Sequence, residues 1–201
     1  MLNPKVVQYC EKYFAGSTSI LSQLEEYKKL LLMENLKMNL IGKSTIDDFD
    51  QRHILDCIQI HKYLKYPNKL IADLGSGAGL PGILLSILGC PNIHLIEKSP
   101  KKSQFLNLCK SRLGLNFKVH NALIEDIKKI NFEIIVARAF APIIKIMTNA
   151  KHLANHQTTF LLLKGKSYLS ELKELNPEQY IWKIYPSITS EEARVINIHL
   201  K

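Results

Sequence analysis

The sequence lacks the features that mark membrane, secreted and zinc-binding proteins. It has no run of roughly 18 or more consecutive apolar residues, so we expect no membrane span. Residues 1–20 mix charged and apolar types and contain no apolar signal core. The four cysteines are scattered and form no Cys-x-x-Cys pair, which argues against a zinc site and against a disulfide framework. We therefore expect a cytoplasmic protein with reduced, structural thiols and no metal.

Internal repeats and low-complexity tracts are also absent. The 201 residues, 46% hydrophobic and 22% charged, are typical of one globular core with room for an appended element. A net charge of +9 permits a polyanionic partner without requiring one. No Asp or Glu occurs between Lys98 and Ile124. Six basic residues fall in that segment: Lys98, Lys101, Lys102, Lys110, Arg112 and Lys118. The segment is either a solvated helix face or a surface for a polyanion.

Residues 1–68 are predicted to form a helical extension. Residues Gly16 to Ser19 are expected to interrupt helical structure and to cap the start of the next helix. Apolar residues then recur at helical spacing: Ile20, Leu24, Tyr27 and Leu31. A second helix is expected to begin at Asp47-Asp48 and to turn three apolar residues inward: Ile54, Leu55 and Ile58. Pro67-Asn68 ends this section.

Residues 69–201 alternate short apolar runs with helical stretches. The candidate strands are Leu70–Leu74, Asn92–Glu97, Phe117–His120, Phe132–Ala137, Thr158–Leu163, Ile181–Ile184 and Arg194–Leu200. The candidate helices lie near Pro81–Leu88, Pro100–Leu113, Pro142–Leu153 and Ser167–Leu175. Such alternation predicts an α/β fold with a mainly parallel sheet and helices on both faces. The last two strands have no helix between them, so we expect a hairpin that adds an antiparallel edge.

The most informative segment is a glycine-rich turn that runs from Asp73 to Gly82, Asp-Leu-Gly-Ser-Gly-Ala-Gly-Leu-Pro-Gly. Glycine removes the side chains that would keep a ligand away from the main chain. Pro81 suits the first turn of a helix, where its missing N–H is not needed. A strand, a bare turn and a helix N-terminus together form a cradle for a nucleotide cofactor. Because Gly77 to Gly82 match the dinucleotide fingerprint, an NAD-dependent oxidoreductase is one alternative.

Asp73 favours a different cofactor. A carboxylate at the tip of the strand would repel a pyrophosphate and attract an ammonium or a sulfonium. S-adenosylmethionine carries both cations and no phosphate. Glu97 ends the next strand, where it is either a ribose-binding carboxylate or a surface carboxylate beside Lys98. Arg138 follows the fourth strand, where it either orients a purine or a phosphate, or forms a surface ion pair.

The chain resembles the glucose-inhibited division protein B family, the guanine-N7 methyltransferases of small-subunit (16S) ribosomal RNA. The resemblance covers most of the chain. It rests on six segments: Met38-Asn39-Leu40, Arg52-His53-Ile54-Leu55-Asp56-Cys57, Asp73 to Gly82, Lys101-Lys102-x-x-Phe105-Leu106, Arg138-Ala139-Phe140-Ala141 and Leu163-Lys164-Gly165. The combination of the glycine turn with the Arg-His-x-x-Asp element is what makes it specific.

The resemblance implies a Rossmann-like S-adenosylmethionine-dependent fold with a seven-stranded sheet, and a set of contacts. With the residues already argued, the expected cofactor contacts are Asp73, Gly75, Gly77, Leu80, Glu97, Leu123, Ile124 and Arg138. The expected RNA contacts are His53, Lys101, Lys102 and Lys164. Two departures from the family pattern stand out. Ala122 to Glu125 replace an Arg-x-Glu-Glu segment, and Cys57 stands where serine is usual.

Methylation of guanine N7 needs no general base, because the nitrogen has an in-plane lone pair and no proton. Direct in-line displacement would depend on positioning and on tolerance of the new positive charge. The expected partner is 16S ribosomal RNA within a partly or fully assembled small subunit, bound by a monomer through salt-sensitive backbone contacts. A non-catalytic RNA-binding protein with a degenerate cofactor pocket is a further alternative.

Overall fold

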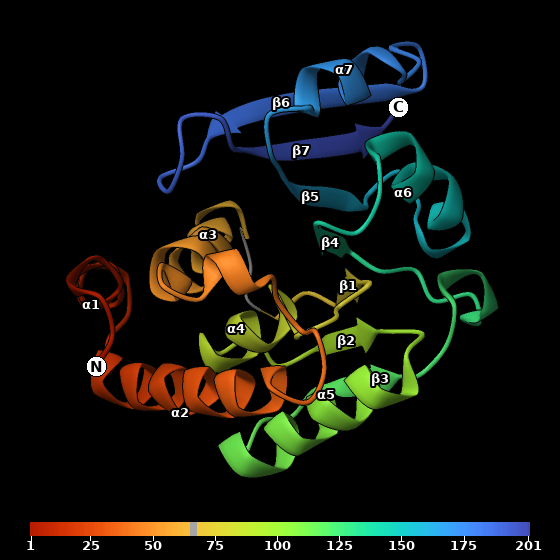
Figure 1. Ribbon diagram of the computed structural model, residues 1–201. Helices are drawn as coiled ribbons and strands as arrows, with labels where there is room; N and C mark the ends of the chain where they lie inside the picture. The colour runs from red at the N-terminus through yellow and green to blue at the C-terminus, as the bar shows by residue number, and fades with distance from the viewer. Residues whose placement is uncertain (65–67) are drawn as a thin grey trace.

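A seven-stranded sheet forms the centre of the molecule in the computed structural model, which describes residues 1–64 and 68–201 (Figure 1). Its strands are β1 (Ile71–Leu74), β2 (Ile93–Ile96), β3 (Lys118–His120), β4 (Ile134–Arg138), β5 (Thr159–Lys164), β6 (Tyr180–Pro186) and β7 (Arg194–Leu200). They lie in the order β3-β2-β1-β4-β5-β7-β6. The order reverses beside β1, so β1 and β4 flank the point where ligands of such sheets bind.

Strands β1 to β5 pair in parallel, as expected, and β6 and β7 form the expected hairpin. Within the hairpin, β7 is the reversed strand. It pairs antiparallel with β5 and lies one place in from the edge, which β6 occupies. The central strands β1 and β2 are buried on both faces, which explains their continuous apolar runs.

Four helices connect the strands: α4 (Gly82–Ile87), α5 (Pro100–Leu113), α6 (Ile143–Asn149) and α7 (Tyr168–Lys173). Helix α5 has the predicted bounds because the Ser99 side chain caps its start and Gly114, at φ +63°, ends it. Helix α6 is shorter than predicted, since it stops at Asn149 and a separate helical turn follows at Lys151–Leu153. Pro81 precedes α4 as its N-cap, one position earlier than expected.

The N-terminal section contains α1 (Pro4–Tyr13), α2 (Ser17–Asn35) and an irregular helical segment over residues 50–63. That segment consists of a π-helix (Asp50–Leu55), the single α-helical turn α3 (Asp56–Ile58) and a 3-10 helix (Gln59–Tyr63). It begins at Asp50, so the predicted start at Asp47-Asp48 is corrected by two residues. Two more short turns lie at Lys43–Thr45 and Ile124–Asp126. Pro67, predicted to end this section, lies outside the described residues.

The two faces of the sheet have different covers. Helices α1, α2, α4 and α5 share one apolar core with Ile71, Leu95 and Val136, whereas α6 and α7 pack on the other face (Figure 1). Tyr27 of α2 donates a hydrogen bond to the Ala78 carbonyl over 2.8 Å, which ties the extension to the glycine turn. No helix in the described part of the chain is long and apolar enough to cross a membrane.

Candidate methyl-donor site

Asp73 lies beneath the glycine turn and fixes the start of α4. Its Oδ2 accepts a hydrogen bond from the Gly82 N–H over 3.0 Å, and its side chain is fully buried. A Cβ at Gly82 would come within 2.7 Å of that oxygen, so only glycine fits there. Burial raises the pKa of Asp73 to about 7. Asp73 does not line the cavity above the turn, since the buried N–H at the helix start takes its carboxylate as acceptor, and its predicted effect on the cofactor stays a prediction.

The second oxygen of Asp73 has no hydrogen-bond partner among the described residues. A buried carboxylate oxygen without a donor is costly, and a cation placed above the turn would lower that cost. We therefore still expect Asp73 to favour a cationic ligand, with the carboxylate acting through the turn and not from the cavity wall.

A cavity of about 440 Å³ opens above the turn, at the carboxyl ends of the parallel strands. We call it the glycine-turn cavity. It is lined by Gly75, Gly77, Ile96, Glu97, Lys98, Lys102, Ala122, Leu123, Ile124, Glu125, Ala139, Phe140, Ala141, Lys145 and Asn149. Its size suits a nucleoside-sized ligand. It brings together six predicted cofactor or RNA contacts, which follow the three strands β1, β2 and β3: Gly75, Gly77, Glu97, Lys102, Leu123 and Ile124.

Glu97 links the turn to the end of β2. Its carboxylate accepts from the Gly77 N–H over 2.9 Å and from the Ser99 N–H over 2.7 Å, and the side chain is 7% exposed. Each carboxylate oxygen can accept more than one hydrogen bond, so a ribose diol fits beside these two N–H groups. Leu123, at 48% exposure, offers an apolar surface on the same cavity wall, which fits a purine ring.

Phe140 closes the cavity on the other side, against Gly75. A Cβ at Gly75 would lie 2.1 Å from the Phe140 ring, and Gly75 has φ +65°. The preceding Ala139 also has positive φ, at +49°, which is unusual for a residue with a side chain. Backbone strain of this kind gathers at ligand sites, where the surrounding structure holds it.

Leu80 and Arg138 are the predicted cofactor contacts that the structure places elsewhere. Leu80 is buried in the core, with its N–H bonded to the Ser76 carbonyl, and it does not line the glycine-turn cavity; its contact with the cofactor stays a prediction. Arg138 lines a separate cavity of about 420 Å³, the Arg138 cavity. Its other lining residues are Asp48, Arg52, Asp56, Gly165, Lys166, Thr189, Ser190, Glu192 and Ala193.

Arg138 joins the N-terminal section to the end of β4. Its guanidinium donates to the Arg52 carbonyl over 3.0 Å and to His53 Nδ1 over 2.9 Å, and its Nε lies 3.2 Å from an Asp56 oxygen. His53 is 5% exposed and its Nε2 lies 2.7 Å from the Thr45 hydroxyl. Burial, followed by the charges of Arg138 and Arg52, lowers the pKa of His53 to about 3. The imidazole is therefore neutral.

The three predicted RNA-binding lysines have different fates. Lys102 lines the glycine-turn cavity, and Lys101 is exposed on the first turn of α5. Lys164 is engaged within the protein: its ammonium lies 2.6 Å from Glu171 and donates to the Ala141 carbonyl over 2.9 Å. Both side chains of this pair are nearly buried, at 10% and 13% exposure. Lys164 therefore holds α7 to β5 and does not face a phosphate.

Sequence reasoning missed Lys145 and Asn149 of α6, which both line the glycine-turn cavity. Their spacing of four residues puts them on one helix face, and two polar residues there would have been the available signal. Lys166, in the Lys164-Gly165-Lys166 run at the end of β5, lines the Arg138 cavity.

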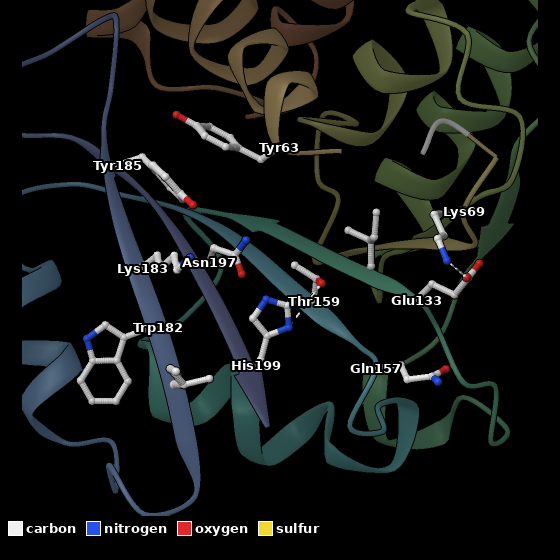
Figure 2. Close-up of a pocket in the computed structure, with 12 residues that line it drawn as sticks. Tyr63, Lys69, Glu133, Gln157, Thr159, Trp182, Lys183, Tyr185, Asn197 and His199 are labelled. Atoms are coloured by element: carbon white, nitrogen blue, oxygen red, sulfur yellow. Dashed lines mark hydrogen bonds and ion pairs between the residues drawn. The ribbon is translucent and has the colours of Figure 1, made fainter. Parts of the chain in front are cut away.

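A second cavity, larger than the glycine-turn cavity, lies at the amino ends of the parallel strands (Figure 2). It measures about 530 Å³ and surrounds the amino ends of β4 and β5, near Ile134 and Thr159. Figure 2 shows Asn197 and His199 at its centre and Tyr63 facing Tyr185. The rings of these two tyrosines are stacked, with their centres 4.4 Å apart. Ligands of open α/β sheets bind at the carboxyl ends, so the glycine-turn cavity is the better candidate despite its smaller size. No group of three or more metal-binding side chains occurs among the described residues.

The chain is similar to known proteins over most of its length. The sequence model described as rRNA small subunit methyltransferase G matches residues 20–194. Ribosomal RNA small subunit methyltransferase G of Rickettsia rickettsii (strain Sheila Smith) is 38% identical over 181 residues, which cover 89% of this chain and 93% of the relative. The protein of the same name from Orientia tsutsugamushi (strain Ikeda) is 32% identical, with 92% of each chain covered.

Solved structures show the same fold at low identity. Ribosomal protein L11 methylase from Lactobacillus delbrueckii subsp. bulgaricus has a TM-score of 0.60 at 16% identity, covering 73% of this chain and 77% of that one. A variant of MtNAS in complex with S-adenosylmethionine also has a TM-score of 0.60, at 15% identity, covering 89% and 75%. Of the two cofactors that the glycine turn left open, the matches support S-adenosylmethionine. The chain belongs to the ribosomal RNA small subunit methyltransferase G family.

Proposed function

We propose that this protein transfers a methyl group from S-adenosylmethionine to N7 of a guanine in small-subunit (16S) ribosomal RNA. One observation carries the proposal beyond the family match: consecutive residues at the end of β4 line the two cavities. Arg138 lines one of them, and the next three residues, Ala139 to Ala141, line the other. A donor in the glycine-turn cavity and an acceptor in the Arg138 cavity would meet at this strand end.

The residues present fit the methyl donor. Glu97 would accept the ribose hydroxyls, Leu123 and Ile124 would pack on the adenine, and Gly75 and Gly77 would admit the ligand to the main chain. When bound, S-adenosylmethionine supplies an electrophilic methyl group on a sulfonium. Phe140, packed on Gly75, would exclude water from the side where the acceptor arrives.

His53 and Asp56, the titratable groups that contact Arg138, are not available as a general base, and N7 chemistry requires none. His53 is neutral, and Arg138, which can only donate, occupies its Nδ1 lone pair. Asp56 is held by Arg138, Gln59 and Thr189. These residues therefore position the acceptor and do not take a proton from it, in keeping with displacement by an unprotonated ring nitrogen.

The Arg138 cavity combines charges of both signs, which suits a guanine nucleotide. Arg52 and Lys166 would bind phosphates. Exposed Asp48 and Glu192 can each accept the two adjacent N–H groups on the Watson–Crick edge of guanine. The base must leave its stack to enter, so we propose a substrate that presents it unpaired, a partly or fully assembled small subunit in the cytoplasm. We propose that the enzyme acts as a monomer.

Methyl transfer tests the proposal directly. The protein is incubated with S-adenosylmethionine carrying a labelled methyl group and with small subunits from cells that lack the enzyme. N7-methylguanine is then located by borohydride reduction and aniline cleavage of the RNA, which cuts at this base. We expect one labelled guanine. Label on a base carbon or an exocyclic amine, or none with any small-subunit substrate, would reject the proposed function.

A further inference from the structure

A cluster of three lysines and two tyrosines lies beside the Arg138 cavity. A shallow cavity of about 290 Å³ on α1 is lined by Lys5, Gln8, Tyr9, Lys12, Tyr13, Leu55, Lys62 and Ile188. We call it the α1 patch. Its lining residues include three lysines and no carboxylate, in contrast to the Arg138 cavity, which has three carboxylates.

The lysines of the α1 patch are free to bind a partner. Lys5, Lys12 and Lys62 are exposed, and within residues 1–64 and 68–201 none of them forms an ion pair. The ammonium group of Lys5 donates a hydrogen bond to the neutral Gln51 amide over 3.2 Å. A phosphate would therefore meet three positive charges without displacing a carboxylate.

Tyrosine rings hold two of these lysines in place. The ammonium of Lys62 lies 4.7 Å from the Tyr13 ring centre and 5.1 Å from that of Tyr9, and Lys12 lies 5.3 Å from Tyr13. A hydrogen bond from Lys62, together with the charges of Lys62 and Lys12, lowers the pKa of Tyr13. Cation–π contacts restrict the long side chains before a ligand binds, so less conformational entropy is lost on binding.

Two segments connect the α1 patch to the Arg138 cavity. Leu55 of the patch ends the π-helix that carries Arg52 and His53, and Ile188 precedes Thr189 in the loop between β6 and β7. Thr189 donates to Asp56 over 2.9 Å, and Gln59 accepts from the Ile188 N–H over 3.0 Å, so the loop is fixed at this junction. A polyanion lying on the patch would be held next to the cavity proposed for the guanine.

From this arrangement we infer that the α1 patch is a second binding site for the ribosomal RNA, which grips backbone phosphates away from the methylated base. The inference rests on the proposed function, which identifies ribosomal RNA as the partner. It adds a site built largely by α1, which lies outside the residues that the family model matches. RNA is favoured over an acidic protein because phosphates along one strand present the repeated single charges that three separate lysines can neutralise.

The test compares a triple variant, Lys5→Gln, Lys12→Gln and Lys62→Gln, with a control that loses the same charge elsewhere. The control is Lys128→Gln, Lys129→Gln and Lys173→Gln, all exposed residues outside the cavities described above. Small-subunit binding is measured against salt, and methyl transfer is measured against subunit concentration. For the patch variant we expect the slope of log Kd against log salt to fall by about 2, and KM to rise about tenfold, since three contacts are lost.

Three outcomes would overturn the inference. The first is a patch variant with the wild-type slope and KM. The second is an equal change of slope and KM in the control variant, which would show that the effect comes from the loss of net charge and not from the α1 patch. The third is failure of the triple Lys→Arg variant to retain the wild-type KM, which would show that the effect is structural. Failure of the proposed function looks different: the wild type would then bind subunits without methylating them.

Discussion

Arg138 donates a hydrogen bond to Nδ1 of His53 over 2.9 Å, across 85 positions of sequence. An arginine has no acceptor, so Nδ1 must be the unprotonated nitrogen and Nε2 must carry the hydrogen, which it donates to Thr45. The pair fixes the N-terminal section against the end of β4. The helical extension is therefore one wall of the proposed acceptor site.

His53 is predicted to stay neutral through the physiological range. Its pKa in the folded protein is about 3, against an ordinary value of 6.5, because burial disfavours the charged ring. The stability this adds is complete above pH 6.5 and is lost as the pH falls from 6.5 toward 3, where the unfolded chain binds a proton and the folded one does not. Nitrogen chemical shifts should show an Nε2–H imidazole that does not titrate between pH 8 and 5. A titration midpoint near 6.5 would contradict the assignment.

Asp73 is predicted to affect stability in the opposite direction. Burial raises its pKa from 3.8 to about 7, so the folded protein holds a proton that the unfolded chain has released. This contribution is complete below pH 3.8 and is lost as the pH rises to 7. Asp73→Asn keeps an acceptor for the Gly82 N–H without the charge, so its urea stability should exceed that of the wild type at pH 8 and the difference should shrink toward pH 5. A difference that grows on acidification would contradict the account.

Gly75→Ala should be far more damaging than Gly77→Ala, although both glycines have positive φ. The new methyl group at Gly75 would lie 2.1 Å from the Phe140 ring, whereas at Gly77 the nearest atom is 3.7 Å away. We expect a loss of about 3 kcal/mol for Gly75→Ala, from left-handed backbone and overpacking together, and about 1 kcal/mol for Gly77→Ala. Urea unfolding measures both, and equal losses would show that Phe140 does not close on Gly75.

Lys164→Met tests whether Lys164 is a structural residue. Removing one partner leaves the Glu171 carboxylate nearly buried without its cation, which costs about 3 kcal/mol. The salt dependence of RNA binding should stay at the wild-type slope, since the ammonium does not face a phosphate. A slope reduced with unchanged stability would restore the original prediction of an RNA contact.

The sequence was sufficient to predict which residues meet at the carboxyl ends of the parallel strands. Gly75, Gly77, Glu97 and Leu123 each follow a parallel strand, and parallel strands end at one edge, so their meeting in one cavity was predictable. Lys164 also follows a strand, but its burial depends on Glu171 of α7 folding back over β5. Neither residue type nor spacing separates a lysine that binds phosphate from one that holds a helix.

Polar contacts between distant residues could not be predicted from the sequence either, because they depend on how distant segments fold together. His53 and Asp56 both contact Arg138, but nothing in their spacing identifies Arg138 as the partner. Asp73 shows how two physical demands compete at one residue. Its charge favours a cationic ligand, yet a buried helix start supplies the nearer hydrogen-bond donor.

Calorimetric titration of the protein with S-adenosylmethionine tests the central claim, that the glycine-turn cavity holds the methyl donor. Wild type, Glu97→Gln and the exposed control Glu178→Gln are compared, with NAD as the competing ligand. The account predicts that the wild type binds S-adenosylmethionine and does not bind NAD. The affinity of Glu97→Gln for S-adenosylmethionine should be at least about tenfold weaker, because a charge-assisted acceptor is lost, and that of the control should be unchanged. Binding of NAD alone, or equal affinity of wild type and Glu97→Gln for S-adenosylmethionine, would contradict it.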